Sequence, residues 1–333
     1  MTIEVEKFTG EADEWDRYID RSPTGTIFHL HDFLETVDKH VNGTVIRLIG
    51  YNGQEPIGVI PFVEIKKFGI STAFSPAPRM GLPYQGPILL GNPSPKRRKQ
   101  EKQHKRFIEN SLTWLDNEIG PSYVYMRTHP AYDDPRPFAW NGFTLTPRYT
   151  YCIDVTRDID EIKMSFSKSL RRYLDPDEDQ YRIEEQGEDG IRFIYQQTRD
   201  RYEAQDKTYA VKEDFLLDLY NIFPDGWVRP YVGIVNDERV AGILIFDDGE
   251  TIYFQEGGAI PDVDFPINDI LHWHIIKEAK KRGVKAYDLH GANTPRLCKY
   301  KSKFNPELEQ YYGIEKGTRF MNIISEGYKK VMF

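Results

Sequence analysis

Cysteine is scarce in this sequence: of its 333 residues only two are cysteine, Cys152 and Cys298. They lie far apart along the chain, and neither belongs to a group with the spacing of metal ligands. A fold held together by a disulfide framework is therefore excluded. The composition suits a reducing compartment.

Long apolar runs are also missing. No stretch approaches the roughly 18 consecutive apolar residues that a membrane-spanning helix needs. Glu4, Glu6 and Lys7 interrupt the first apolar residues, which argues against a signal peptide. With 39% hydrophobic and 14% aromatic residues, the chain can still build packed cores, and its length predicts two domains. We expect a soluble, cytoplasmic, monomeric protein.

Positive charge is lacking overall but concentrated in one segment. The formal net charge is −8, which argues against a protein that coats nucleic acid. The segment 96–106, KRRKQEKQHKR, nevertheless holds seven lysines and arginines against one glutamate. This cluster predicts attraction of a polyanion such as tRNA. The alternative is the solvated face of a helix that buries Phe107, Ile108, Leu112 and Leu115.

An ordered series of landmarks occurs twice in the sequence. Residues 31–62 contain a helix start, a strand, an Asn-Gly turn and a second strand, and residues 213–246 repeat this order with an Asn-Asp turn. Later in each half, a helix ending at a glycine precedes a short strand. These later segments are 107–120 with 123–126, and 270–283 with 286–289. The repeat predicts an α+β protein with two mixed sheets.

The repeat also places the domain boundaries. We assign residues 1–148 to a first domain and residues 149–312 to a second. Residues 313–333 carry apolar side chains at helical spacing. We expect them to form a C-terminal helix that packs back onto the first domain.

The segment that follows the second helix and glycine, residues 287–304, is the strongest candidate site. A short buried strand ends at Asp288, and Gly291 then opens a loop that contains Lys299, Lys301 and Lys303. A lysine near an acidic strand end is a common arrangement at the edge of a sheet. The alternative is that the three lysines are a solvated charge run.

Two adjacent arginines, Arg171 and Arg172, lie near the end of a helix predicted over residues 158–174. They could grip a phosphate or carboxylate of a substrate. Basic residues at a helix C-terminus also complement the helix dipole, so one of the pair is expected to be structural.

The motifs of the second half resemble the Fem family of peptidoglycan bridge-forming aminoacyltransferases and their FemAB-like relatives. The closing pattern of that family is Asp-x-x-Gly, a short gap, then Phe-Lys-x-x-Phe. This sequence has Asp288-x-x-Gly291 and Tyr300-Lys301-x-x-Phe304, with tyrosine in place of the first phenylalanine. The first half is similar to the family at Thr26-Ile27-Phe28 and at Pro83-Tyr84-Gln85-Gly86-Pro87.

The resemblance implies two tandem GNAT-like domains and transfer of an acyl or aminoacyl group to an amine. It implies that Lys301 stabilises the oxyanion formed when the amine attacks, and Asp288 is the nearest acidic candidate for the base. Capping of the following loop is an alternative role for Asp288. The implied substrate-binding residues are Tyr84, Arg171, Arg172, Arg201, Tyr300 and Phe304. We expect no metal and no covalent intermediate, because neither pattern is present in the sequence.

The acyl donor is the open question. The glycine-rich turn that opens a helix in coenzyme A-binding GNAT enzymes is missing before the helix at 270–283. Its absence favours aminoacyl-tRNA, bound through Lys96–Arg106, with no tightly bound cofactor. The alternatives are an N-acyltransferase that uses acyl-CoA or an acyl carrier protein on an amino sugar or small amine, and a non-catalytic glycan- or RNA-binding module.

Overall fold

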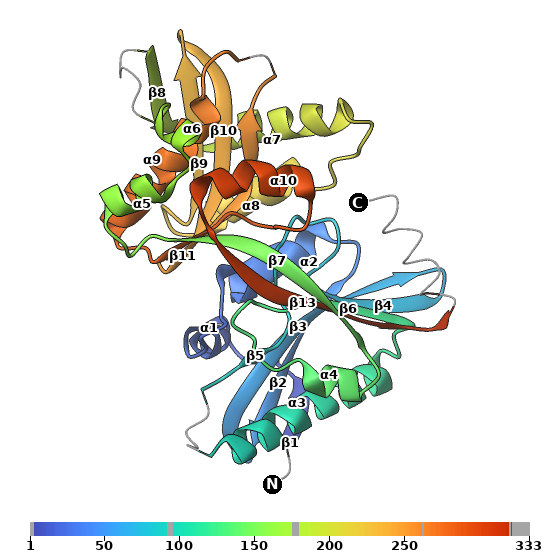
Figure 1. Ribbon diagram of the computed structural model, residues 1–333. Coiled ribbons are helices and arrows are strands. Elements are labelled where there is room, and N and C mark those ends of the chain that lie inside the picture. The colour runs from blue at the N-terminus through green and yellow to red at the C-terminus, as the bar shows by residue number, and fades with distance from the viewer. Residues whose placement is uncertain (1–2, 92–95, 175–179, 262, 320, 322–333) are drawn as a thin grey trace. The chain divides into compact units, whose positions relative to one another are not determined.

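The computed structural model describes residues 3–91, 96–174, 180–261, 263–319 and 321 of the chain (Figure 1). The chain divides into two compact units. The first comprises Met1–Arg148 and Gln310–Phe333, and the second comprises Tyr149–Glu309. The strands β7 (green) and β13 (red) carry the chain from one unit to the other.

The first unit contains a sheet, helices and a short 3₁₀ turn. Its elements are β1 (Ile3–Lys7), α1 (Ala12–Asp20), η1 (Ile27–His29), α2 (His31–His40), β2 (Thr44–Asn52), β3 (Glu55–Lys67), β4 (Ile70–Ser75), β5 (Ile88–Leu89), α3 (Arg97–Glu118), β6 (Tyr123–Arg127) and α4 (Arg136–Trp140).

The second unit repeats this composition. Its elements, with the two strands that link the units, are β7 (Thr144–Asp154), α5 (Ile159–Ser165), α6 (Lys168–Arg171), β8 (Tyr181–Glu185), α7 (Glu188–Glu203), α8 (Glu213–Ile222), β9 (Val228–Val235), β10 (Glu238–Asp247), β11 (Thr251–Ala259), α9 (Ile267–Arg282), β12 (Ala286–Asp288), α10 (Pro295–Lys301), η3 (Ser302–Phe304) and β13 (Glu307–Gly317).

The strands of the two units follow the same pattern. In the first unit β1, β2, β3 and β4 are antiparallel neighbours, β6 is parallel to β4, and β13 is antiparallel to β6. In the second unit β8, β9, β10 and β11 are antiparallel neighbours, β12 is parallel to β11, and β7 is antiparallel to β12. The predicted α+β fold, with mixed strand pairing and flanking helices in each half, is therefore confirmed. The prediction of two separate sheets is wrong, because β7 and β13 each run from one unit into the other and the strands belong to one 13-stranded sheet.

Each parallel pair is joined by a crossover helix, as parallel strands require. α3 connects β4 to β6 and buries Phe107, Ile108, Leu112 and Leu115. α9 connects β11 to β12 and ends at Gly283, whose φ of 81° gives the left-handed C-cap that glycine favours. Both helices lie where the sequence predicts them.

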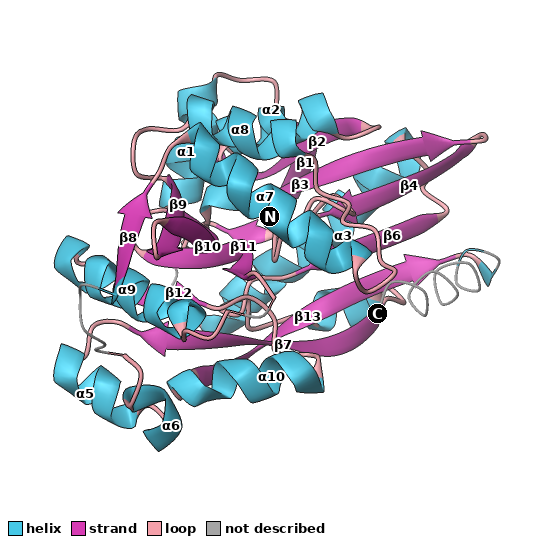
Figure 2. Cartoon of the chain, turned by 90° about the horizontal axis from the view of Figure 1, so that it is seen from above, coloured by secondary structure: helices cyan, strands magenta, loops and turns pink. Residues whose placement is uncertain are grey.

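In the second unit, helices cover both faces of the sheet, and Figure 2 shows β9, β10 and β11 between α7 and α9. On the α7 face, a Cβ atom at Gly242 would lie 2.4 Å from Ile194 of α7. On the other face, Ile267 and Leu271 of α9 belong to the buried core that contains Ile243. Cross-strand neighbours share a face, so residues of β11 can be assigned to the α7 side or the α9 side.

Three parts of the predicted secondary structure differ from the structure. The helix expected over 158–174 is two short helices, α5 and α6, because Phe166 and Ser167 are extended between them. Phe166 is buried against the rings of Trp273 and Phe304 at 5.6 and 5.5 Å. This tertiary packing overrides the helical pattern.

The second difference concerns the chain end. Residues 313–317, which we expected to begin a C-terminal helix, belong to the strand β13. The remainder of that expected helix, from Thr318 onward, falls almost entirely outside the described residues. Within the described residues, no helix has both the length and the apolar character needed to cross a membrane.

Candidate functional site

The third difference lies at the site itself, where part of the loop expected after Gly291 forms the helix α10. The site borders the point at which the strands β11 and β12 separate. These parallel strands pair over Thr251–Tyr253 and Ala286–Asp288, and β11 then continues to Ala259. Over the described residues, the last part of β11 pairs with β10 alone, and its other backbone edge faces the opening between the two strands. In open sheets, ligands bind beyond the carboxyl ends of parallel strands at such a divergence. The segment around Asp288 borders this opening.

Lys301 lies on a helix and is buried, which corrects the expectation of an exposed loop. α10 begins with Pro295, a residue favoured in the first turn, and Lys301 is its last residue. Lys301 is 8% exposed. Its Nζ donates hydrogen bonds to the carbonyl oxygens of His290 and of Gly291, the latter at 3.0 Å. The lysine therefore fixes the turn that follows β12, where His290 and Gly291 have φ of 57° and 73°.

The charge of Lys301 is also perturbed. Burial lowers the pKa of Lys301 to about 8, and the nearby Asp288 carboxylate acts in the opposite direction. An ammonium group has three N–H donors, of which the two carbonyls use two. The third can serve a ligand.

The aromatic rings near Lys301 are arranged differently from the sequence order. Nζ of Lys301 lies 5.8 Å from the ring centre of Phe254 on β11, a residue that the sequence gave no reason to select. Over the ring of Tyr300 lies a different lysine, Lys303, whose Nζ is 4.4 Å from the ring centre. Phe304 is 1% exposed and packs against His272 at 5.2 Å. The side chains of Tyr300 and Phe304 are thus part of the hydrophobic core next to the site.

The other two lysines of the segment are distinct from Lys301. Lys303 forms an ion pair with Asp269 of α9 at 2.8 Å, which anchors η3 to that helix. Lys299 is exposed. The segment is therefore not a uniform charge run, because its three lysines have three different environments.

Asp288, like Lys301, stabilises the turn that follows β12. Its Oδ1 accepts hydrogen bonds from Thr150 Oγ1 at 2.6 Å and from the backbone N–H of His290 at 2.7 Å. Asp288 is 5% exposed. These contacts correspond to the capping role, which the sequence offered as the alternative to a catalytic base.

A second polar group lies on the α7 face of β11 and was missed by the sequence analysis. Glu256 pairs across the strands with Leu244, next to the pair formed by Gly258 and Gly242, and this face packs against α7. Burial raises the pKa of Glu256 to about 8, and the guanidinium of Arg201 opposes that shift. The available signal was the polar run Gln-Glu-Gly-Gly inside an otherwise apolar strand.

Gly258 leaves room for the side chain of Arg201 on this face of β11. A Cβ atom at Gly258 would lie 2.2 Å from Nη1 of Arg201, so only glycine admits the guanidinium against the strand. Arg296 of α10 reaches the same region, because its Nη2 contacts Gln205 Oε1 beyond the end of α7 at 3.4 Å. The predicted substrate-binding residue Arg201 therefore lies beside Glu256.

The remaining predicted substrate-binding residues lie elsewhere. Arg172 is exposed, and Arg171 contacts the carbonyl oxygen of Met164 at 3.4 Å. The helix α6 that carries them lies beside η3, since the N–H of Ser167 bonds to the carbonyl of Lys303 at 2.8 Å. Tyr84 belongs to the first unit, where its 1%-exposed side chain packs on other aromatic rings.

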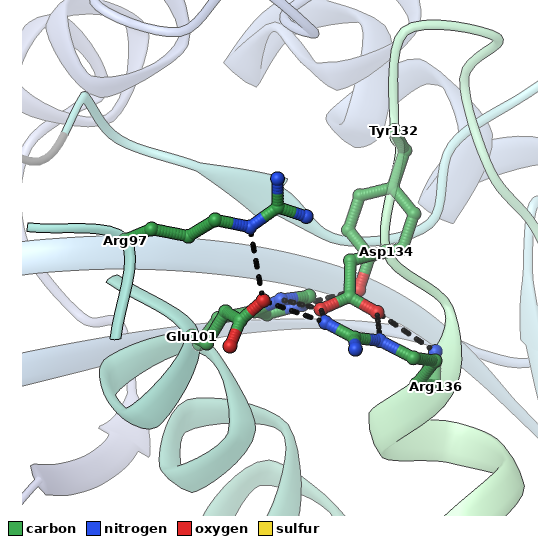
Figure 3. A network of polar contacts seen from close by, with 6 residues as sticks. Arg97, Glu101, Tyr132, Asp134 and Arg136 are labelled. Carbon is green, nitrogen blue, oxygen red and sulfur yellow. Dashed lines mark hydrogen bonds and ion pairs between the residues drawn. The ribbon is translucent and has the colours of Figure 1, made fainter. Parts of the chain in front are cut away.

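The basic cluster Lys96–Arg106 lies on α3 in the first unit, and part of it is ion-paired. Arg97 Nε lies 3.1 Å from Glu101 Oε1, and Figure 3 shows Arg136 between the carboxylates of Glu101 and Asp134. The side chains of Arg98, Lys99 and Lys102 are exposed. Beside this network is a pocket of about 380 Å³. Its apolar lining residues include Ile57, Leu89, Leu90 and Phe107.

Comparison with known proteins places this geometry in a class. Residues 164–302 match the family model described as an acetyltransferase (GNAT) domain. No curated protein matches the chain. Among solved structures, FemX is similar over 92% of this chain and 96% of its own, with a TM-score of 0.71 at 13% identity.

Two further solved structures have the same arrangement. The structure of L-PGS from Bacillus licheniformis has a TM-score of 0.55 at 13% identity and covers 93% of both chains. A tandem GNAT protein from the clavulanic acid biosynthesis pathway has a TM-score of 0.55 at 9% identity, over 94% of this chain and 97% of its own. The chain therefore has the tandem GNAT-like fold of acyltransferases, as its Fem-like motifs implied.

Proposed function

We propose that this protein transfers an acyl or aminoacyl group from an activated ester or thioester to an amine, in the manner of the Fem-like proteins. The observation that carries the proposal is Lys301, a buried cation at the opening between β11 and β12. The proposal is further supported by the acetyltransferase domain that residues 164–302 match and by the similarity to FemX.

Acyl transfer to an amine requires stabilisation of one developing negative charge. When a neutral amine attacks the acyl carbon, the carbonyl oxygen becomes an oxyanion that needs preorganised positive charge. Lys301 is already immobilised by two carbonyl groups, so it need not reorganise during the reaction. Burial strengthens its field relative to that of a lysine in water. Its role in this proposal is to hold the acyl carbonyl and stabilise the oxyanion.

Aminoacyl-tRNA is the donor that we favour. The exposed lysines and arginines of α3 could bind phosphates, and Arg171 or Arg172 could bind an anionic group of the acceptor. The glycines Gly257 and Gly258 lie on β11, upstream of Ile267 where α9 begins, so they do not form a phosphate-binding turn at the helix start. The donor would arrive as a substrate, and no tightly bound cofactor is required.

A thioester donor is the second candidate, and one observation favours it. The edge of β11 beyond Tyr253 offers backbone N–H and C=O groups to the opening. An extended arm with amide groups, as in acyl-CoA or an acyl carrier protein, could add to this edge like a strand.

Parallel incubations separate these candidates. The protein is mixed with radiolabelled aminoacyl-tRNAs in one series and with radiolabelled acetyl-CoA in another, each with the same panel of primary amines. Transfer of label from tRNA to an amine supports the Fem-like activity, and transfer from acetyl-CoA supports the thioester alternative. If the protein binds tRNA or glycans but transfers label from neither donor, it is a non-catalytic binding module.

A further inference from the structure

An exposed tryptophan lies beside cations from two helices of the first unit. Trp140, the last residue of α4, is 57% exposed. Nζ of Lys105 on α3 lies 5.8 Å from the centre of its ring, and the guanidinium carbon of Arg136 lies 5.5 Å from it. Figure 1 shows α4 next to α3. This surface therefore combines a flat aromatic side chain with positive charge.

The cations of α3 form a row that ends at the tryptophan. Arg98, Lys102 and Lys105 are exposed, and their spacing of four and then three residues places them along one side of the helix. At 1.5 Å per residue the row covers roughly 10 Å. Lys105 has a carboxylate partner, Glu109 at 3.5 Å, whereas Arg98 and Lys102 have none among the described residues. The row can therefore bind anionic groups.

The guanidinium of Arg136 is fixed next to the ring. Its Nε lies 2.7 Å from Asp134 Oδ1, and its Nη2 lies 3.0 Å from Glu101 Oε1, as Figure 3 shows. Glu101 in turn belongs to α3 and also pairs with Arg97. Because these contacts already order the side chain, a ligand that binds here loses little free energy in ordering it.

We propose that Trp140 is a stacking platform for an unpaired base of RNA, whose phosphates follow the row Arg98, Lys102 and Lys105. The inference rests on the proposed aminoacyl-tRNA donor and deepens it, because it assigns the contact to a single-stranded part of the donor, either its unpaired 3′ end or a loop. Every base has a π face, so such stacking tolerates any sequence. A duplex offers the row its phosphates, but its bases are already stacked on one another.

The composition of the surface favours RNA over a lipid bilayer. An interfacial anchor presents an apolar face made of several side chains. Within the part of the chain that the structure describes, Trp140 is the single exposed large hydrophobic residue of α3 and α4. One ring among cations matches a backbone with bases better than it matches a membrane surface.

Two replacements of Trp140 separate stacking from simple apolar contact. Trp140→Leu keeps an apolar side chain without a ring, and Trp140→Tyr keeps a ring. In fluorescence-anisotropy titrations with a labelled single-stranded oligoribonucleotide, W140L should bind about 5–100-fold more weakly than wild type and W140Y within about threefold of it. Binding of an RNA duplex of the same length should not change in either variant.

Phe68→Ala is the matched control. Phe68 is also an exposed ring of the first unit with a cation near it, since it is 93% exposed and Nζ of Lys67 lies 5.4 Å from its ring centre. It lies in the β3–β4 turn, outside α3 and α4. F68A should therefore bind both RNAs as the wild type does.

The salt dependence distinguishes the ring from the row of cations. Stacking releases no counterions, so W140L should weaken binding by the same factor at every salt concentration. Lys105→Glu removes a phosphate contact and should lower the slope of log K against log salt by roughly 0.7 for a single strand. A W140L variant whose slope falls like that of K105E would contradict stacking.

Intrinsic fluorescence reports the contact directly. The chain has five tryptophans, so the signal of Trp140 is the difference between the wild type and W140Y. The oligoribonucleotide should quench this difference signal to saturation, with the same affinity as in the anisotropy titration. A difference signal that RNA leaves unchanged would overturn the proposal.

Further arms identify the source of the unpaired base and the alternatives. If trimming the unpaired 3′ end of tRNA abolishes the effect of W140L, the base belongs to that end, and if the effect persists, it belongs to a loop. Wild-type affinity of W140L for single strands would overturn the inference. Binding of anionic phosphatidylglycerol vesicles that requires Trp140, without binding of RNA, would also overturn it.

The inference and the proposed function can fail separately. Binding of RNA that requires Trp140, in a protein that transfers no acyl group from either donor, would support the platform and overturn the proposed function. Transfer from aminoacyl-tRNA with unchanged RNA affinity in W140L would overturn the platform alone.

Discussion

Lys301 donates a hydrogen bond from Nζ to the carbonyl oxygen of Gly291 at 3.0 Å, across the turn that closes β12. The same Nζ bonds to the carbonyl of His290, so one side chain holds two consecutive peptide groups. A motif in which Gly and Lys lie ten residues apart in sequence is thereby a single structural unit. The lysine is positioned by the turn that it stabilises.

Replacement of Glu256 should change how stability depends on pH. The pKa of Glu256 is about 8 in the folded protein, above the 4.5 that is usual for a glutamate, so the native state keeps a proton that the unfolded state loses between these values. The stabilising contribution is complete below about pH 4.5, declines as the pH rises and is lost above about 8. Relative to wild type, E256Q should gain up to about 1.4 kcal/mol per pH unit in this window.

Urea unfolding between pH 5 and pH 9 measures this difference. Glu238→Gln, an exposed glutamate of β10, is the control and should follow the wild-type curve. Parallel curves for wild type and E256Q would contradict the raised pKa.

Gly258→Ala should displace Arg201 from Glu256. The new Cβ would lie 2.2 Å from Nη1 of Arg201, and the φ of 151° disfavours alanine. Because Arg201 lowers the pKa of Glu256, its displacement should raise that pKa and extend the pH dependence of stability above pH 8. Arg201→Gln should shift the pKa in the same direction.

Gly249→Ala is the matched control for backbone strain. Gly249 has a φ of 86°, but an added Cβ meets nothing within 4 Å. It should cost roughly 1–2 kcal/mol of stability and leave the pH dependence of stability unchanged. If G249A and G258A change that pH dependence equally, the contact with Arg201 is not the cause.

Charge reversal on α3 tests the binding of tRNA. Arg98→Glu, Lys99→Glu and Lys102→Glu replace exposed side chains and leave the Arg97–Glu101 pair intact. Affinity for tRNA should fall, and the slope of log K against log salt should decrease by roughly 0.7–0.9 per lost phosphate contact. Filter binding at several salt concentrations measures both.

A triple reversal at scattered exposed lysines, Lys66, Lys281 and Lys285, controls for net charge. It should have a smaller effect. If the α3 variant keeps wild-type affinity at every salt concentration, the basic residues of α3 are only a solvated helix face.

The rate of the wild type should fall at alkaline pH. Burial lowers the pKa of Lys301 to about 8, so the charge that stabilises the oxyanion is lost as the pH rises through that value. A rate that stays constant from pH 6 to pH 10 would contradict this role of Lys301.

Much of the fold could be predicted because its signals are local. The strand Val228–Val235 lies within the predicted repeat at 213–246, and α9 ends at the predicted glycine. The repeated order of landmarks was enough to predict the mixed strand pattern of each half, but not that the strands belong to one sheet. Long-range packing was not visible: Phe166 interrupts a helical pattern because Trp273 and Phe304 bury it.

The site was only partly predictable for the same reason. The spacing between Asp288 and Lys301 identified one side of the opening, but not the burial of Lys301. Glu256 was missed because its unusual environment depends on α7, which is more than 50 residues earlier in the chain. Arg201 was predicted from the family resemblance, and the structure shows that it acts on the charge of Glu256.

Turnover of the Lys301 variants tests the central claim most directly. Lys301→Ala and Lys301→Met are compared with Lys299→Ala and Lys303→Ala, using whichever donor the wild-type protein accepts. Loss of Lys301 leaves two carbonyls without their donor, so unfolding should become easier by about 1–3 kcal/mol. Rates are therefore measured well below each melting temperature.

The account predicts that both Lys301 variants lower kcat by about 10²–10³-fold. Lys299→Ala should be neutral because its side chain is exposed, and Lys303→Ala should lose stability through the broken Asp269 pair but keep most of its kcat. Equal, mild losses from all of these variants, each folded at the assay temperature, would contradict a role for Lys301 in acyl transfer.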